Sequence, residues 1–135
     1  EEGPVSTPFE YRPVGEELML CQRYFEKSFA SRLPIRANNG VVTCIVTFTQ
    51  AAAGNTGQYG MVIDMQVQKR VQPTVVLYCP GNESSQVWNY SQGVACTGTM
   101  VQSVTQRSFA IGTVTPVSSQ PGNGLQIEWT ADAEI

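Results

Sequence analysis

Apolar and polar residues alternate along much of the chain that follows Asn39-Gly40, a dipeptide typical of a turn. The alternation is clearest over 61–67, where every second residue is Met, Ile or Val, which is typical of a strand with one buried face. The pattern predicts further strands at 40–50, 74–79, 86–90, 94–102, 106–114 and 125–130, separated by Gly, Pro and Asn turns. Short strands at this spacing predict a mainly β fold, an antiparallel β-sandwich of jelly-roll-like type over residues 40–135.

The residues before this region have a different pattern. Prolines 4, 8 and 13 predict an extended lead-in over 1–14, because proline cannot donate a backbone hydrogen bond. Leu18, Cys21 and Phe25 then recur at helical spacing, and Glu16 and Glu17 suit the first turn of a helix. We expect one amphipathic helix over 15–29, which packs on its own sheet or bundles with copies from other chains.

Length and composition fit one domain of 135 residues, and no internal repeat divides it. Since the chain begins with Glu1 rather than Met, we expect it to be a piece of a longer polypeptide. Charged residues make up only 14%, against about 25% in average domains, whereas Gln, Thr, Ser and Asn number 12, 12, 10 and 6. The net charge of −3 argues against nucleic-acid binding, and no apolar run is long enough to predict a membrane span or a signal peptide.

Several kinds of catalytic or metal site are excluded or poorly supported. The chain has no histidine, which removes Ser-His, Cys-His and His-metal chemistry within one chain. The acids outside the termini and the helix start are Glu10, Glu26, Asp64, Glu83, Glu128 and Asp132, and the sequence names no glycosidase pair among them. Asp64 and Glu128 fall on polar strand positions, where solvation is the default. Asp132 and Glu134 are two residues apart, an interval that acidic calcium ligands often have. Carboxylates at a chain end are usually just solvated, however, so this interval gives little support for a calcium site. We therefore expect no catalytic residues, no metal and no cofactor.

The four cysteines are Cys21, Cys44, Cys79 and Cys96, and no pair has the CxxC spacing of a zinc or redox site. Two disulfides are conceivable. Because Cys44 and Cys79 lie in apolar runs, free core thiols in a protein assembled in a reducing cytosol are the favoured interpretation.

One aromatic and amide-rich stretch is a candidate ligand site. Trp88, Asn89 and Tyr90 lie in a neutral, loop-rich region, and Tyr59 ends the Gly-rich loop 51–59. Aromatic faces stack on sugar rings or lipid-like ligands, and neighbouring amides satisfy hydroxyl groups. The alternative, which the pattern favours, is that Trp88 packs in the core.

Three segments of the chain resemble a family of virion proteins. The longest runs from Ser6-Thr7-Pro8-Phe9-Glu10-Tyr11-Arg12-Pro13 through Glu17-Leu18-x-Leu20-Cys21-Gln22-Arg23-Tyr24-Phe25-x-Lys27-Ser28. The others are Gln68-Lys69-Arg70-x-x-Pro73-Thr74-Val75-x-Leu77-Tyr78 and Trp129-Thr130-Ala131-Asp132-Ala133-Glu134-Ile135. Together they are similar to the C-terminal domain of tail-fibre and receptor-binding proteins of tailed bacteriophages and prophages. Phe25 stands where a second Tyr is common, and residues between Cys79 and Gly124 match nothing in the family.

The resemblance implies a homotrimer in the virion tail, assembled in the host bacterial cytoplasm together with other tail proteins. It implies binding to a bacterial surface polysaccharide or protein receptor, and it supplies no catalytic residues. It also implies that Phe9, Arg12, Leu18, Cys21, Arg23 and Tyr24 seat the lead-in and helix against the sandwich. The alternatives are a purely structural virion protein and, less favoured, a glycan-degrading enzyme.

Overall fold

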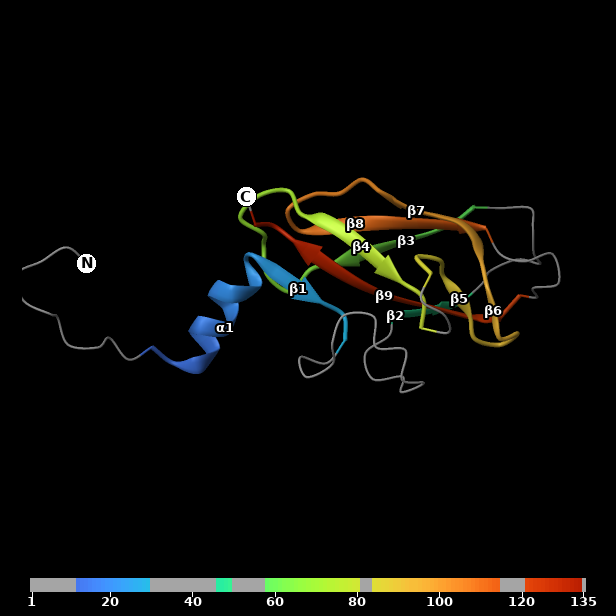
Figure 1. The fold of residues 1–135 in the computed structure, drawn as a ribbon, viewed down its shortest axis with the longest axis horizontal. Helices are drawn as coiled ribbons and strands as arrows, with labels where there is room; N and C mark the ends of the chain where they lie inside the picture. Colours follow the sequence, from blue (N-terminus) through green and yellow to red (C-terminus); the bar gives the residue numbers. More distant parts are fainter. Residues whose placement is uncertain (1–11, 30–45, 50–57, 81–83, 115–120, 135) are drawn as a thin grey trace, which may run out of the picture.

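The computed structural model describes residues 12–29, 46–49, 58–80, 84–114 and 121–134. These residues form one helix followed by strands (Figure 1). The strands that pair with one another are antiparallel. The elements are α1 (Val14–Gln22), β1 (Phe25–Lys27), β2 (Val46–Thr49), β3 (Gln58–Asp64), β4 (Thr74–Tyr78), β5 (Trp88–Asn89), β6 (Val94–Ala95), β7 (Thr97–Gln102), β8 (Ser108–Val114) and β9 (Gly124–Asp132).

The last strand, β9, organises the larger of two sheets. Both β1 and β4 pair with residues 130–132 of β9, and both β2 and β5 pair with residues 125–126. Because a strand has two edges, β1 and β4 lie on opposite sides of β9, as do β2 and β5. The sheet is completed by β6, which pairs with β5. One nine-residue strand therefore joins segments from the beginning, middle and end of the chain.

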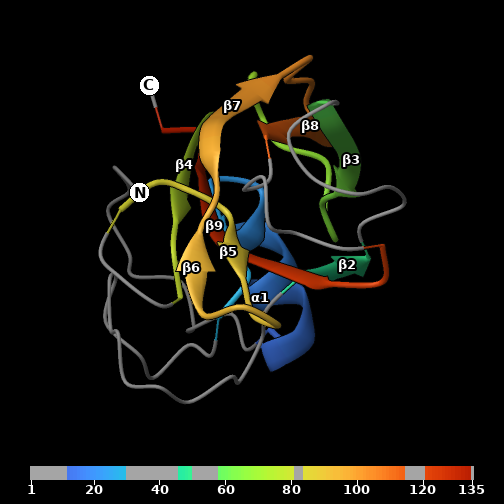
Figure 2. The same ribbon diagram turned by 90° about the vertical axis from the view of Figure 1, so that its right-hand side faces the viewer.

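The smaller sheet has the order β3-β8-β7 and packs against one face of the larger sheet (Figure 2). Their shared core takes residues from both sheets, including Ile63 and Ile111 from the smaller and Leu125 and Ile127 from the larger. At its centre the rings of Phe109 and Trp129 meet edge to face, with centroids 5.1 Å apart. This arrangement confirms the predicted antiparallel β-sandwich preceded by a helix.

The sequence placed most strands well but assigned too much of the N-terminal segment to the helix. The predicted strands at 61–67, 74–79, 86–90, 106–114 and 125–130 correspond to β3, β4, β5, β8 and β9, and 94–102 is divided into β6 and β7. The helix ends at Gln22 rather than residue 29, and Phe25 lies in β1. Pairing with β9 overrides the helical spacing there, because β1 completes the sheet edge. The predicted lead-in over 1–11 and the strand residues 40–45 lie outside the described residues.

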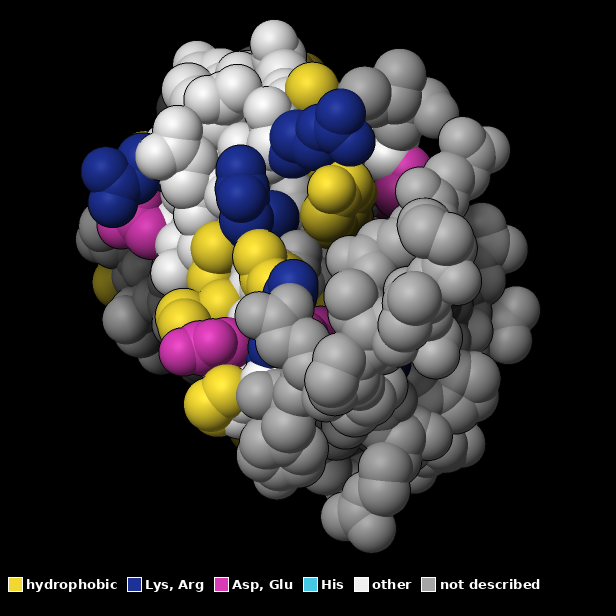
Figure 3. Space-filling view, turned by 90° about the vertical axis from the view of Figure 1, so that its left-hand side faces the viewer, with side chains coloured by type: hydrophobic (Ala, Val, Ile, Leu, Met, Phe, Trp, Pro, Cys, Tyr) yellow, Lys and Arg dark blue, Asp and Glu magenta, His cyan; other side chains and the backbone are white. Residues whose placement is uncertain are grey.

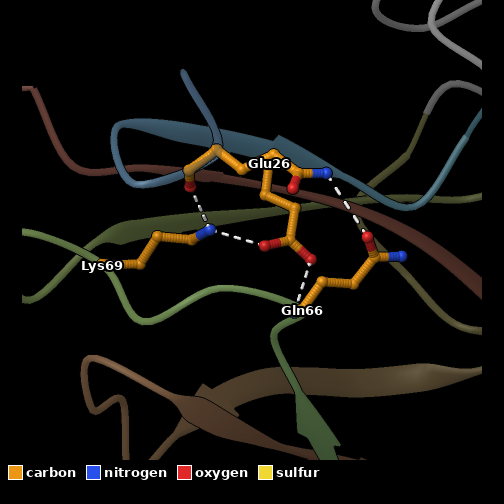
Figure 4. A network of polar contacts seen from close by, with 4 residues as sticks. Glu26, Gln66 and Lys69 are labelled. Atoms are coloured by element: carbon orange, nitrogen blue, oxygen red, sulfur yellow. Dashed lines mark hydrogen bonds and ion pairs between the residues drawn. The ribbon is translucent and has the colours of Figure 1, made fainter. Parts of the chain in front are cut away.

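A buried ion pair fastens β1 to the connection between β3 and β4 (Figure 4). Lys69 Nζ lies 2.5 Å from Glu26 Oε2, with the Lys69 side chain fully enclosed. The same ammonium group donates to the Gln22 carbonyl at 2.5 Å, and Glu26 Oε1 accepts from the Gln66 backbone N–H at 3.0 Å. Both charges therefore have hydrogen-bond partners, which a buried pair requires if it is not to destabilise the fold.

Backbone contacts extend this attachment on either side of β1. The Arg70 N–H donates to the Arg23 carbonyl at 3.0 Å, and the Ala133 N–H donates to the Tyr24 carbonyl at 2.6 Å. The Arg70 guanidinium also lies over the Tyr24 ring, 5.6 Å from its centroid. The end of α1 and the start of β1 are thus held by two segments that are distant in sequence.

Replacing Lys69 by Met is expected to destabilise the protein by about 3–5 kcal/mol, because Glu26 would remain as an unpaired buried charge. Urea unfolding followed by circular dichroism measures the change. The double variant Lys69→Met/Glu26→Leu is expected to recover most of the loss, since it removes both charges.

Arg107→Met is the matched control, because Arg107 is exposed and the substitution removes one positive charge elsewhere. Its effect is expected to stay within about 0.5 kcal/mol. A Lys69→Met variant as stable as this control would contradict the role given to the pair.

Candidate functional site

A groove of about 390 Å³ lies on the outer face of the larger sheet, where β1, β9 and β4 run side by side. Its lining residues are Phe25, Thr74, Val76, Tyr78, Thr130, Asp132 and Glu134. Strand register accounts for most of this set, because directly opposed residues in a sheet point to the same face. Phe25 and Thr74 both oppose Asp132, and Val76 opposes Thr130.

The groove has a buried floor and exposed carboxylates. Tyr78 and Thr130 are buried, and their hydroxyl groups lie 3.5 Å apart. Phe29 packs edge to face on Tyr78, with ring centroids 6.3 Å apart. Asp132 and Glu134 are exposed, and the Glu134 N–H donates to Asp132 Oδ1 at 2.9 Å, which fixes the turn that carries both carboxylates.

These groups suit a ligand that has many hydroxyl groups. Ionised carboxylates accept hydrogen bonds only, so Asp132 and Glu134 can each receive several hydroxyl donors. The Thr74 hydroxyl both donates and accepts, and it is exposed at the groove. Half-buried Phe25 and Val76, which is 39% exposed, add apolar surface for the C–H face of a sugar ring.

Glu128 lies on the same outer face, opposite Tyr78. Partial burial raises the pKa of the Glu128 carboxyl above its ordinary value, because desolvation penalises the charged form. Its sequence neighbours Ile127 and Trp129 point into the core, as expected from strand alternation. The Glu128 carboxyl is therefore partly desolvated by neighbouring protein atoms, whereas the sequence predicts a freely solvated acid.

The structure separates the residues that the sequence grouped as a ligand site. Trp88 opposes Gln126 on the outer face of the sheet and is half-buried, whereas the neighbouring Asn89 is fully buried on the core side. The Asn89 Oδ1 atom accepts from the Gln92 N–H at 3.1 Å, so this amide holds the turn between β5 and β6.

The two tyrosines of the predicted site lie in different parts of the fold. Tyr90 is 63% exposed in the turn between β5 and β6. The backbone of Tyr59 lies in β3, opposite Thr113. A binding role for Trp88 and Tyr90 stays a prediction.

The acid pairs considered from the sequence also have definite positions. Asp64 follows Ile63, whose side chain lies in the core, so Asp64 faces away from the core on the smaller sheet. Glu128 faces away from the core on the larger sheet, and two sheet layers therefore separate this pair. Asp132 and Glu134 do lie together in the groove, but no group of three or more potential metal ligands occurs among the described residues.

The cysteines within the described ranges are free thiols, namely Cys21, Cys79 and Cys96, and Cys44 lies outside those ranges. Burial raises the pKa of Cys96 to about 11, an effect that Cys79 reinforces and a Thr113 hydrogen bond opposes. Cys96 is consequently a neutral thiol at neutral pH and a poor nucleophile. Cys21 is exposed, in contrast to the core position expected for the cysteines.

The sequence did not identify the groove for a specific reason. Phe25 was assigned to a helix, and Thr74 and Val76 were counted only as part of an apolar run. Their common face is set by the pairing of β1 and β4 with β9, which joins residues about 50 and 100 positions apart. The sequence over 74–78 is Thr-Val-Val-Leu-Tyr, which does not alternate between polar and apolar residues, so no local signal marked this face.

Comparison with known proteins gives no relative, since no family model, no curated protein and no solved structure matches the chain. Within the part of the chain that the structure covers, no helix combines the length and apolarity needed to span a membrane.

Replacing Glu128 by Gln is expected to stabilise the protein relative to wild type increasingly as pH rises from about 4 to 7. The raised pKa means that the folded protein holds the Glu128 proton more tightly than the unfolded chain does. The stabilisation of the wild-type fold by protonated Glu128 is complete at low pH and is lost as pH rises through the folded-state pKa. Gln does not titrate, so the variant lacks this loss. Melting temperatures at a series of pH values measure the difference.

Asp64→Asn removes a carboxylate charge from the exposed face of the other sheet and serves as the control. A Glu128→Gln effect that is the same at pH 4 and pH 7 would contradict the desolvation of Glu128.

Proposed function

We propose that this chain is a domain of a tailed-bacteriophage tail fibre or tail tip that binds a carbohydrate on the bacterial surface as a homo-oligomer. The observation that carries the binding role is the groove on the outer face of the larger sheet. There, two exposed carboxylates and a threonine hydroxyl lie beside aromatic and aliphatic surface. Recognition of sugars commonly combines these two kinds of contact.

The arrangement of the three segments that resemble tail-fibre proteins supports the phage assignment. β1, which ends at Lys27 of the first segment, and β4, which begins at Thr74 of the second, flank the third segment along β9. The described C-terminal end of the first stretch thus packs with the other two stretches, although the three are far apart in sequence. Among the lining residues, five are matched positions of the resemblance, whereas Val76 is an unmatched position and Phe25 departs from the usual Tyr; the five are Thr74, Tyr78, Thr130, Asp132 and Glu134.

The composition supports recognition through hydrogen bonds rather than through charge. Neutral Gln, Thr, Ser and Asn total 40, against 19 charged residues. A surface of this kind has little long-range electrostatic steering, so specificity depends on shape and hydrogen bonding. Weak single sites of this type gain strength when several copies bind one surface, because the second binding event occurs at high effective concentration.

A purely structural role in the virion is the second interpretation, and cell binding separates the two. A structural protein would assemble stably with other virion proteins and would not adsorb to cells. A glycan-degrading role draws no support from Asp64 and Glu128, because they occupy the outer faces of different sheets.

The fluorescently labelled chain is expected to bind susceptible bacteria and to lose binding to mutants of the same strain that lack surface polysaccharide. Asp132→Asn is expected to weaken binding to the extracted polysaccharide about tenfold, since one hydrogen bond to a charged group is worth about 1.5 kcal/mol. Asparagine keeps the Oδ1 acceptor for the Glu134 N–H, so the turn should persist. Titration of labelled protein with the extracted polysaccharide gives the affinity.

Asp64→Asn is the matched control on the opposite outer face, and its affinity is expected to stay within about twofold of wild type. Tyr90→Ala tests the aromatic turn separately. Equal binding by polysaccharide-free cells, or equal effects of Asp132→Asn and Asp64→Asn, would contradict binding of carbohydrate in the groove.

A further inference from the structure

Strands β4 and β5 lie in line along one edge of β9. Successive residues of a strand direct their backbone groups to alternate edges. The Trp129 carbonyl accepts from the Ser28 N–H, which follows β1. The Gly124 carbonyl accepts from the Tyr90 N–H, which follows β5, and Gly124 is an odd number of residues from Trp129. β5 therefore lies on the edge of β9 opposite β1, the edge that β4 also occupies, and it continues the line of β4.

This arrangement places two aromatic residues in line with the groove on the outer face of the larger sheet. Tyr78 is the last groove-lining residue of β4, and Trp88 follows it two positions further along β9. The hydrogen bond to Gly124 extends the pairing to Tyr90, which shares the face of Trp88 because one residue separates the two. We refer to the groove, Trp88 and Tyr90 together as the outer strip.

The outer strip combines a buried floor with accessible aromatic surface. Tyr78 in the groove and Gln126 opposite Trp88 are buried on this face. Trp88 and Glu128 are half-buried, and Tyr90 is exposed in the turn that follows β5. Partly accessible rings beside amide and hydroxyl groups can stack on the apolar faces of sugar rings. The outer strip therefore continues the chemistry of the groove beyond the groove itself.

The two ends of the outer strip differ in charge. The groove end carries the carboxylates of Asp132 and Glu134. Figure 3 views the end of the molecule from which α1 projects and shows charged side chains of both signs among apolar ones there. By contrast, residues 84–106 and 121–127, which form and flank the aromatic end, include no charged residue. Carboxylates can accept hydrogen bonds from one part of a ligand while the aromatic end stacks on neutral rings.

We propose that the outer strip binds a glycan chain of several sugar units along β9, with one part of the chain in the groove and further sugars on Trp88 and Tyr90. The segment of β9 from Asp132 to Gly124 is about 27 Å long, far longer than one sugar ring. The inference rests on the proposed function, since it takes the groove to bind carbohydrate. It adds that the ligand is a chain rather than a single terminal sugar.

Fragments of graded length test this proposal. The extracted polysaccharide is partly hydrolysed and separated by size, and titration calorimetry gives the affinity of each fraction. Wild-type affinity is expected to rise with length well beyond the disaccharide. Trp88→Ala is expected to weaken binding of the longest fragments at least about fivefold. It should change the affinity of those mono- and disaccharides whose binding depends on Asp132 by less than about twofold, because they occupy the groove.

A second variant fills the aromatic end without removing a packed side chain. Gly124 lies beside Tyr90, and among the described residues a Cβ at Gly124 would meet only Ser91 Oγ, at 3.8 Å. Gly124→Leu is therefore expected to fold and to weaken binding of long fragments. Gly60→Leu is the matched control on the outer face of the smaller sheet, where a Cβ would come no nearer than 3.9 Å to the Ile111 carbonyl. Circular dichroism of each variant checks that the fold is retained.

Three results would overturn the extended site. They are an affinity that stops rising at the disaccharide, equal effects of Trp88→Ala on short and long fragments, and equal effects of Gly124→Leu and Gly60→Leu. If Asp132→Asn still weakened the binding of short fragments, the groove and the proposed function would stand without the extension. Failure of every fragment to bind the wild-type chain would contradict the proposed function and the extension together.

Discussion

The contact on which the N-terminal part of the structure depends is the enclosed ion pair between Lys69 and Glu26. Its two charges come from segments more than 40 residues apart, and each is further satisfied by backbone groups of Gln22 and Gln66. Breaking such a pair costs far more than the intact pair contributes, so neither partner can be lost alone. The short strand β1 is consequently held beside β9 by more than its three paired residues.

The position of β1 has consequences at both ends of the strand. On one side it completes the groove, since Phe25 forms part of the lining together with residues of β4 and β9. On the other side it anchors the end of α1, whose remaining turns have no buried side chain. One contact thus supports both the surface proposed to bind carbohydrate and the attachment of the helix to the sandwich.

The sequence predicted strands that a local pattern of apolar and turn residues marks. It did not predict features that depend on pairing between distant strands. A period of two identified β3, and turn residues bounded β4, β8 and β9. The same reasoning assigned Phe25 to a helix, because a three-residue strand has too few positions to show a period. It also could not indicate that Lys69 is enclosed, since a lysine after a strand is ordinarily solvated. Groove and ion pair both arise from contacts between distant segments.

Hydrogen exchange of three backbone amides tests most directly whether β1 and its ion pair belong to the cooperative core. These are the N–H groups of Gln66, Arg70 and Ala133, which donate to Glu26, Arg23 and Tyr24. The account predicts that all three exchange with the same opening free energy as the amides of central strand β9. Exchange of these three amides at the rate of freely solvated backbone, with β9 still protected, would contradict it.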